Sequence, residues 1–195
     1  MKNISFQVIA LACSMFWLSN CQQQPQQDQT AAPATPTQAD LVQRGQYLVN
    51  MLGCDDCHTP KNMTPQGPAP DMTRRFMGHP AAEPFAMDQA KKDMITSQFV
   101  AIFSPSMTAV AGPWGVSFAA NISPDDTGIG NWTEAQFMKA IREGKSKGLD
   151  GTRPLLPPMP WQMYRNMTDE DLKSVFAYLK SMKPVQNVVP QPLTM

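Results

Sequence analysis

Histidine and cysteine are scarce in this sequence, which limits the metal and catalytic sites that it can build. Its 195 residues include two histidines and four cysteines. An excess of charge of one sign is also lacking, because 16 basic residues balance 16 acidic ones, so no overall field attracts nucleic acid. Beyond the first 20 residues no segment is apolar for long enough to span a membrane, and no internal repeat is present.

The first 20 residues are typical of a secretory signal peptide. Lys2 supplies a positive charge, and residues 4–18 form an apolar stretch that is too short for a membrane span. Residues 18–21, Leu-Ser-Asn-Cys, are similar to a bacterial lipobox and predict cleavage before a lipidated Cys21. A similar tetrapeptide ending at Cys13 is a second candidate, and ordinary cleavage that leaves Cys21 unmodified is the alternative.

The segment after the leader predicts a tether. Residues 21–37 consist largely of Gln, Pro, Ala and Thr, which cannot bury enough apolar surface to offset the entropy lost on ordering. We therefore expect a disordered tether over 21–37 and one domain over 38–195. The leader and Cys21 predict an exported protein, held by a lipid in the periplasm or on the outer side of the cytoplasmic membrane.

The most informative motif is Cys-Asp-Asp-Cys-His at residues 54–58, the attachment pattern of a c-type haem. Cys54 and Cys57 lie on one turn and can each form a thioether to the same porphyrin, and His58 is then placed to be the proximal iron ligand. A thioredoxin-like pair, half of a zinc site and chance occurrence are the alternatives. With the other two cysteines in the leader, none remains for a disulfide. The single motif predicts one covalent haem c.

A second axial ligand decides whether the iron transfers electrons or binds small molecules. The strongest candidate is Met159, because prolines at 157, 158 and 160 fix the backbone around its thioether. Met163 and Met167 lie nearby without such a bracket. His79 precedes a proline in a loop, and we expect it to be a surface or hydrogen-bonding residue.

Three helices are predicted from apolar spacing and capping residues. The first covers about 39–52, and Gly45 within it favours close contact with another helix, through Phe176 and Tyr178. The second begins at Thr133 and ends at Gly144, and the third begins at Thr168 and ends before a proline at 184. Between the haem motif and the second helix we expect a loop over 60–71, a short helix within 88–102 and a short strand over 114–119.

Several of these features together resemble the monohaem cytochrome c family. The chain is more closely similar to the haem modules in cytochrome subunits of membrane-bound bacterial alcohol and aldehyde dehydrogenases. The matching segments are 121–125 (NISPD), 127–132 (TGIGNW), 142–144 (REG), 156–160 (LPPMP), 169–172 (DEDL) and 176–179 (FAYL). The resemblance implies a mainly α cytochrome c fold, with three principal helices and long loops wrapped around one haem. Those subunits contain several haem modules, whereas this chain contains one. The resemblance therefore implies only the electron-transfer role of a single module.

The predicted function is one-electron transfer without catalysis. The protein would take electrons from a respiratory donor, such as a dehydrogenase or a quinol-oxidising complex, and pass them to a terminal acceptor. Ligation by histidine and methionine favours a relatively high potential. The alternatives are a haem enzyme of peroxidase type and a haem-based sensor, both of which need an open sixth position. Trp114, Trp132 and Arg153 are candidate hydrogen-bond donors to the haem propionates.

Overall fold

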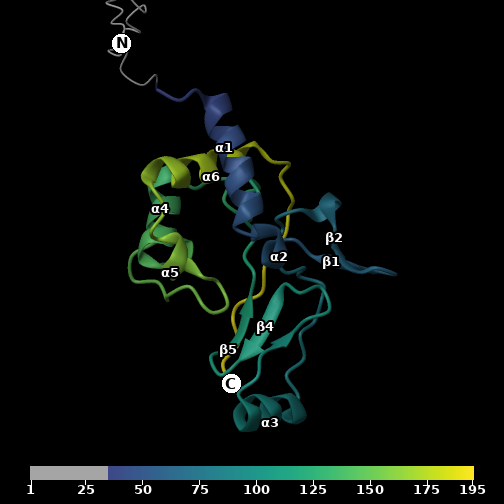
Figure 1. Ribbon diagram of the computed structural model, residues 1–195. Helices are drawn as coiled ribbons and strands as arrows, with labels where there is room; N and C mark the ends of the chain where they lie inside the picture. The colour runs from purple at the N-terminus through teal and green to yellow at the C-terminus, as the bar shows by residue number, and fades with distance from the viewer. Residues whose placement is uncertain (1–34) are drawn as a thin grey trace, which may run out of the picture. The chain divides into compact units, whose positions relative to one another are not determined.

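The computed structural model describes residues 35–195, so the predicted signal peptide, Cys21 and most of the tether lie outside the described residues. The described chain groups Pro36–Met195 into one compact unit. Its helices are α1 (Gln38–Met51), α2 (Cys54–His58), α3 (Gln89–Gln98), α4 (Glu134–Glu143), α5 (Trp161–Tyr164) and α6 (Asp169–Ser181), with 3-10 turns at Met72–Arg74 and Ser146–Gly148 (Figure 1). Its strands are β1 (Lys61–Thr64), β2 (Gly67–Pro70), β3 (Ile102–Phe103), β4 (Ala109–Gly112) and β5 (Gly115–Phe118). Within residues 35–195 no helix combines the length and the apolar character needed to cross a bilayer.

Helices α1 and α6 cross at Gly45, as predicted. A Cβ atom at this position would lie 1.9 Å from the carbonyl oxygen of Ser174 and 2.7 Å from the Cβ of Tyr178. Tyr178 is therefore part of the contact. The expectation for Phe176 was wrong, because its ring packs against that of Phe137 on α4, with 5.1 Å between the ring centroids. Residue 176 lies two positions before Tyr178 on the helix and so faces a different side.

The three predicted helices begin and end at local signals. The side chains of Thr133 and Thr168 accept hydrogen bonds from the N–H groups of residues 136 and 171, and so cap α4 and α6. Helix α4 ends at Gly144, whose φ of 65° is a left-handed conformation that glycine adopts without strain. The description as three principal helices is incomplete, because α2, α3, α5 and two small sheets are present as well.

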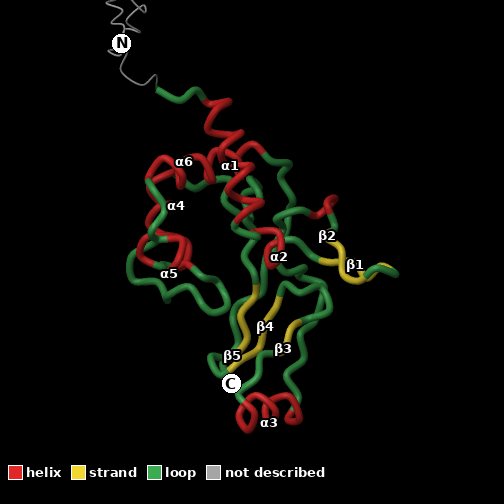
Figure 2. Tube along the Cα trace, viewed as in Figure 1, coloured by secondary structure: helices red, strands yellow, loops and turns green. Residues whose placement is uncertain are grey.

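The predicted loop over 60–71 is instead a hairpin, and that prediction was wrong. Strands β1 and β2 pair antiparallel, with Lys61 opposite Pro70 and Thr64 opposite Gly67 (Figure 2). Prolines in β2 are tolerated because both strands of a two-stranded sheet are edges, so some of their N–H groups need no partner in the sheet. The prolines that suggested a loop therefore do not exclude a hairpin.

A second sheet holds the middle and the end of the chain together. It has the antiparallel order β3-β4-β5, and β5 lies within the range 114–119 where a short strand was predicted. Helix α3, which forms within the predicted range 88–102, buries Ile95 against Ala111 and Val116 of this sheet. The C-terminal tail joins β5, where Val116 and Leu193 exchange two backbone hydrogen bonds of 2.8 and 3.0 Å. Strand β5 is thus fixed on both edges.

Candidate cofactor site

The cysteines of the haem motif lie half-buried on α2, and both thiols are free. Burial, with the negative charge of Asp55, raises the pKa of Cys54 to about 12, and burial also raises the pKa of Cys57. A thioredoxin-like pair needs a thiol with a lowered pKa, so these cysteines do not have that character. Within residues 35–195 no group of three or more His, Cys, Asp or Glu side chains is placed to hold a metal ion, which also disfavours a zinc site.

The imidazole of His58 is held in a form suited to ligation. Its Nδ1 lies 2.8 Å from the carbonyl oxygen of Ala120, and because a carbonyl only accepts, Nδ1 carries the proton. Burial lowers the pKa of His58, so the ring is neutral at neutral pH. The lone pair on Nε2 is then free to bind a metal, and the carbonyl of Ala120 fixes the tautomer and ring orientation.

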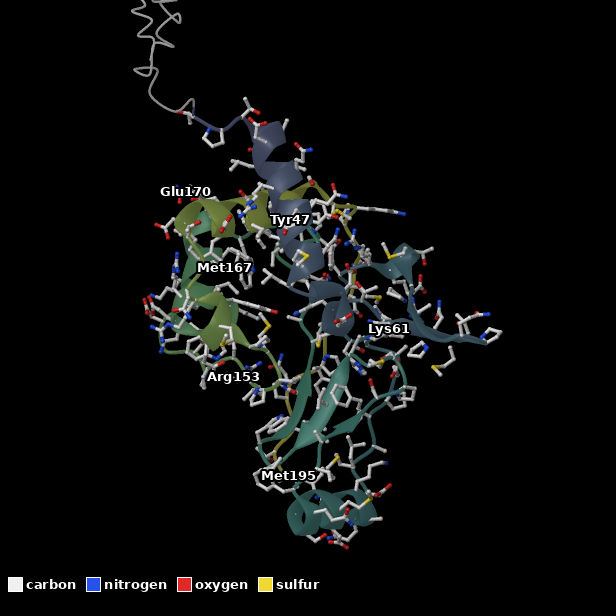
Figure 3. All side chains as sticks on the ribbon, viewed as in Figure 1. Tyr47, Lys61, Arg153, Met167, Glu170 and Met195 are labelled. Carbon is white, nitrogen blue, oxygen red and sulfur yellow. The ribbon has the colours of Figure 1, made fainter. Side chains whose placement is uncertain are left out.

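The carboxyl end of α2 is closed by a lysine. Lys61, labelled in Figure 3, donates from Nζ to the carbonyl oxygens of Asp55, Asp56 and Thr59 at 2.7, 3.0 and 2.5 Å. Helix C-terminal carbonyls lack partners within the helix and carry partial negative charge, so a cation there is stabilising. Lys61 thereby holds the short helix in place although it begins the neighbouring strand β1.

An arginine joins α2 to α6. Arg75 donates from Nε and Nη2 to the carboxylate of Asp55 at 2.9 and 2.6 Å, and from Nη1 to the hydroxyl of Tyr178 at 2.8 Å. Although burial would raise the pKa of Asp55, the hydrogen bonds from Arg75 and Thr59 lower it below its ordinary value. Asp55, one of the two residues between the cysteines, is therefore ionised and fixed, which sets the orientation of the haem motif.

The loop with Met159 packs on the same apolar core as the haem motif. This core contains buried residues from α1, α4, α6 and two connections, and Met159, Cys54 and Met167 are half-buried against it. Two side chains hold the loop: Ser117 Oγ donates to the carbonyl oxygen of Pro157 at 2.5 Å, and Tyr164 Oη donates to that of Leu52 at 2.8 Å. The fold thus brings the predicted distal region and the attachment motif to one cluster.

The other candidate ligands differ in their surroundings. Met163 is 70 % exposed, so its thioether is not directed into the core. Met167, which Figure 3 labels between α5 and α6, packs against the same cluster as Met159 and so remains the competing methionine.

His79 is fully buried, which corrects the expectation of a surface residue and confirms that of a hydrogen-bonding one. Its Nδ1 is 2.9 Å from Thr108 Oγ1, and its Nε2 donates to the carbonyl oxygen of Glu83 at 2.9 Å. The ring also packs against that of Phe118, with 4.9 Å between the centroids. Both ring nitrogens are engaged within the protein, so neither is free to act as an iron ligand.

The three candidate hydrogen-bond donors to the haem propionates differ in their burial and in their hydrogen bonds. The indole Nε1 of Trp114, in the turn between β4 and β5, is buried and has no hydrogen-bond partner within residues 35–195. Arg153 is exposed and donates to the carbonyl oxygen of Pro154 at 3.0 Å, and Trp132 packs against the core. Trp114 is therefore the one of the three whose N–H group is buried without a partner within residues 35–195, so that a bound group could supply the acceptor.

The donor set fits a covalently attached haem. Two half-buried thiols stand three positions apart on one helix, and the next residue offers a neutral imidazole nitrogen. Cys54 packs against the same apolar core as several other half-buried apolar side chains. Sequence reasoning missed Arg75, Ala120, Ser117 and Tyr164. No local pattern marks these residues, because each reaches its partner across at least 20 positions of chain.

Comparisons with known proteins relate most of the chain to one family. Residues 42–183 match the family model described as Cytochrome c. The chain is 32 % identical over 170 residues to the fructose dehydrogenase cytochrome subunit of Gluconobacter japonicus, which covers 84 % of this chain and 26 % of that protein. It is 30 % identical over 162 residues to the gluconate 2-dehydrogenase cytochrome c subunit of Pantoea cypripedii, covering 80 % and 27 %.

A shorter match is stronger in identity. Over 85 residues the chain is 40 % identical to the cytochrome c subunit of the quinone-dependent alcohol dehydrogenase of Gluconacetobacter polyoxogenes, covering 43 % of this chain and 18 % of that protein. The matched part of the chain therefore spans about a quarter or less of the length of each of these three relatives.

Proposed function

Because the chain belongs to the cytochrome c family, we propose that it is a one-electron carrier with a single haem c attached through Cys54 and Cys57. When bound, the haem supplies an iron that is reduced and reoxidised by one electron. The observation that carries the proposal is the hydrogen bond from His58 Nδ1 to Ala120, which leaves Nε2 free to bind the iron. The protein residues hold and orient the group and set its potential.

We further propose Met159 as the second axial ligand. Support comes from its packing against the apolar core that Cys54 also contacts, and from the two hydrogen bonds that hold its loop. A thioether opposite an imidazole fills the iron's coordination and raises the potential, which suits electron delivery. A peroxidase or a sensor would need a vacant sixth coordination position on the iron, and a peroxidase would also need an acid–base group near that position. His79 does not favour this role, because its ring nitrogens are engaged with Thr108 and Glu83.

Replacing Met159 tests this assignment. Met159→Ala is expected to abolish the methionine–iron charge-transfer band of the oxidised protein and to open the iron to cyanide and carbon monoxide. The potential should fall on the order of 0.1–0.2 V, within the ~0.8 V that axial ligands span. Absorption spectra and a redox titration measure these effects, and Met163→Ala is the control that should match wild type. Loss of the band in Met167→Ala, with Met159→Ala unaffected, would transfer the role to Met167.

The relatives suggest which proteins donate electrons to this one and accept electrons from it. The relatives named above are subunits of dehydrogenases, so we propose that the donor is a dehydrogenase or a quinol-oxidising complex and that the acceptor is terminal. This chain contains one Cys-x-x-Cys-His motif, which fits a carrier for one electron at a time. We propose no catalytic activity of its own.

We propose that the protein is exported and anchored through Cys21 in the periplasm or on the outer side of the cytoplasmic membrane. The proposal depends on the signal-like residues 1–20 and the polar segment 21–37. Cys21→Ser is expected to abolish fatty-acid labelling and to move the haem protein from the membrane to the soluble fraction. Cys13→Ser is the matched control and should keep the label. Wild-type protein that is soluble and begins beyond residue 21 would contradict the anchor while leaving the carrier function intact.

A further inference from the structure

We infer that Tyr164 and Ser117 are positioning residues that hold Met159 in place for ligation, and that they set how readily this ligand leaves. The inference rests on the proposed role of Met159. Neither residue has a charge or a motif that suggests a functional role. Each places one hydroxyl group on a backbone carbonyl that lies far away in sequence, and the two hydrogen bonds tie the loop to different parts of the site.

The loop has little means of holding itself. Prolines at 157, 158 and 160 have no N–H, so the residues on both sides of Met159 cannot donate backbone hydrogen bonds. The N–H of Met159 itself bonds to the carbonyl oxygen of Leu156 at 3.2 Å, which closes a turn within the loop but attaches it to nothing else. The nearest backbone bond to another element is made by Leu155, four residues before Met159, whose N–H donates to the carbonyl oxygen of Gly144 at 2.7 Å. Beyond that bond, attachment of the loop depends on side-chain donors.

Tyr164 ties the far side of the loop to the haem motif. It ends α5, five residues after Met159, and its hydroxyl donates to the carbonyl oxygen of Leu52 at 2.8 Å. Leu52 caps α1 and stands two residues before Cys54, so the bond joins α5 to the connection that leads into α2. Burial raises the pKa of Tyr164 to about 12, so the hydroxyl keeps its proton and donates throughout the neutral range.

Ser117 ties the near side of the loop to β5. The residue is 9 % exposed, and its hydroxyl donates to the carbonyl oxygen of Pro157 at 2.5 Å, two residues before Met159. The same hydroxyl lies 3.3 Å from the carbonyl oxygen of Val110. A serine hydroxyl has one proton to donate, and the shorter distance indicates that Ser117 donates it mainly to Pro157. Three residues further along, Ala120 accepts the hydrogen bond from His58.

One segment of chain therefore serves both proposed axial ligands. Residues 117–120 fix the loop of Met159 at one end and orient the imidazole of His58 at the other. The segment is itself held by backbone pairing: Ser117 is paired with Val110 of β4, and Ala119 donates to the carbonyl oxygen of Thr108 at 2.8 Å and accepts from the N–H of His79 at 2.9 Å. The geometry assigns Ser117 and Tyr164 the task of keeping the weaker of the two ligands preorganised.

The expected consequence is faster loss of the methionine. A net hydrogen bond of this kind shifts a local equilibrium about fivefold, so each anchor removed should raise the dissociated fraction of Met159 about fivefold, and both together about 25-fold. Cyanide binds the oxidised iron only when the methionine has left. Its association rate in the haem-loaded full-length protein reports this fraction directly.

The experiment compares Tyr164→Phe, Ser117→Ala and the double variant with wild type. We expect cyanide to bind about fivefold faster in each single variant and about 25-fold faster in the double variant, with the methionine–iron band still present at neutral pH. Ser174→Ala is the matched control, because it removes a buried hydroxyl that donates to a backbone carbonyl at 2.7 Å within α6. It should leave the cyanide rate within about twofold, whatever its effect on the denaturation midpoint.

Two results would overturn the inference. One is an unchanged cyanide rate in both single variants of a protein whose band is lost in Met159→Ala. The other is an equal acceleration in Ser174→Ala, which would mean that general destabilisation and not loop anchoring controls the ligand. Failure of the proposed function is recognised separately, because Met159→Ala would then keep the band of the wild-type protein.

Discussion

Replacing Cys54 and Cys57 together with alanine is expected to yield a chain with no covalently attached haem. Each thiol is the only group near its position that can form a thioether, and no other free cysteine lies within residues 35–195. In a strain competent for cytochrome c maturation, acidified organic solvent should leave haem on the wild-type protein and none on the double variant. Mass spectrometry should show one porphyrin added to wild type and none to the variant.

The same substitution should also destabilise the fold. Several apolar side chains around the core are only half-buried in the protein chain, among them Ile122, Met138 and Met159. These side chains are available to cover a flat apolar cofactor, so the chain without it leaves them in water. We expect circular dichroism of the double variant to show reduced helix content. Met163→Ala, which removes an exposed thioether, is the control and should keep both haem and helices. A folded, haem-free wild-type protein from a competent strain would contradict the assignment.

Helix positions were predictable because their signals are local. A threonine whose side chain accepts from the N–H three residues later marks the start of α4 and of α6, and Gly144 marks the end of α4. These interactions involve neighbours in sequence, so a short stretch contains all the information that they need. The crossing at Gly45 was predictable for a related reason, because a glycine costs helix stability unless it permits a close approach.

The surroundings of the site were not predictable, because they depend on contacts between distant segments. The partner of His58 lies 62 positions away, and that of Tyr164 lies 112 positions away. Nothing in the sequence near His79 indicates that Thr108, 29 positions away, will hydrogen-bond to its Nδ1. The hairpin over 61–70 was missed because proline weighs against strands in general, whereas an isolated pair of edge strands accommodates it.

The pairing of α1 with α6 should be sensitive to one methyl group. Gly45→Ala places a Cβ 1.9 Å from the carbonyl oxygen of Ser174, and this oxygen belongs to the backbone of α6 and cannot rotate away. Two effects oppose each other, since alanine favours a helix over glycine by about 1 kcal/mol, whereas overpacking a tight contact costs about 1–3 kcal/mol and sometimes more. The steric effect should win, because relief requires the two helices to separate. We expect net destabilisation of about 1–2 kcal/mol.

Denaturant unfolding of the haem-loaded protein measures this change, and Gln46→Ala is the control. Gln46 is the exposed neighbour of Gly45 on the same helix, so its substitution alters helix propensity without touching α6 and should stay within ~0.5 kcal/mol of wild type. The effect of Gly45→Ala should extend to the haem site, because α1 leads directly into Leu52, the acceptor for Tyr164, and then into Cys54. Cyanide should therefore bind the Gly45→Ala protein faster than wild type. A variant as stable as Gln46→Ala would show that the two helices are further apart than the structure has them.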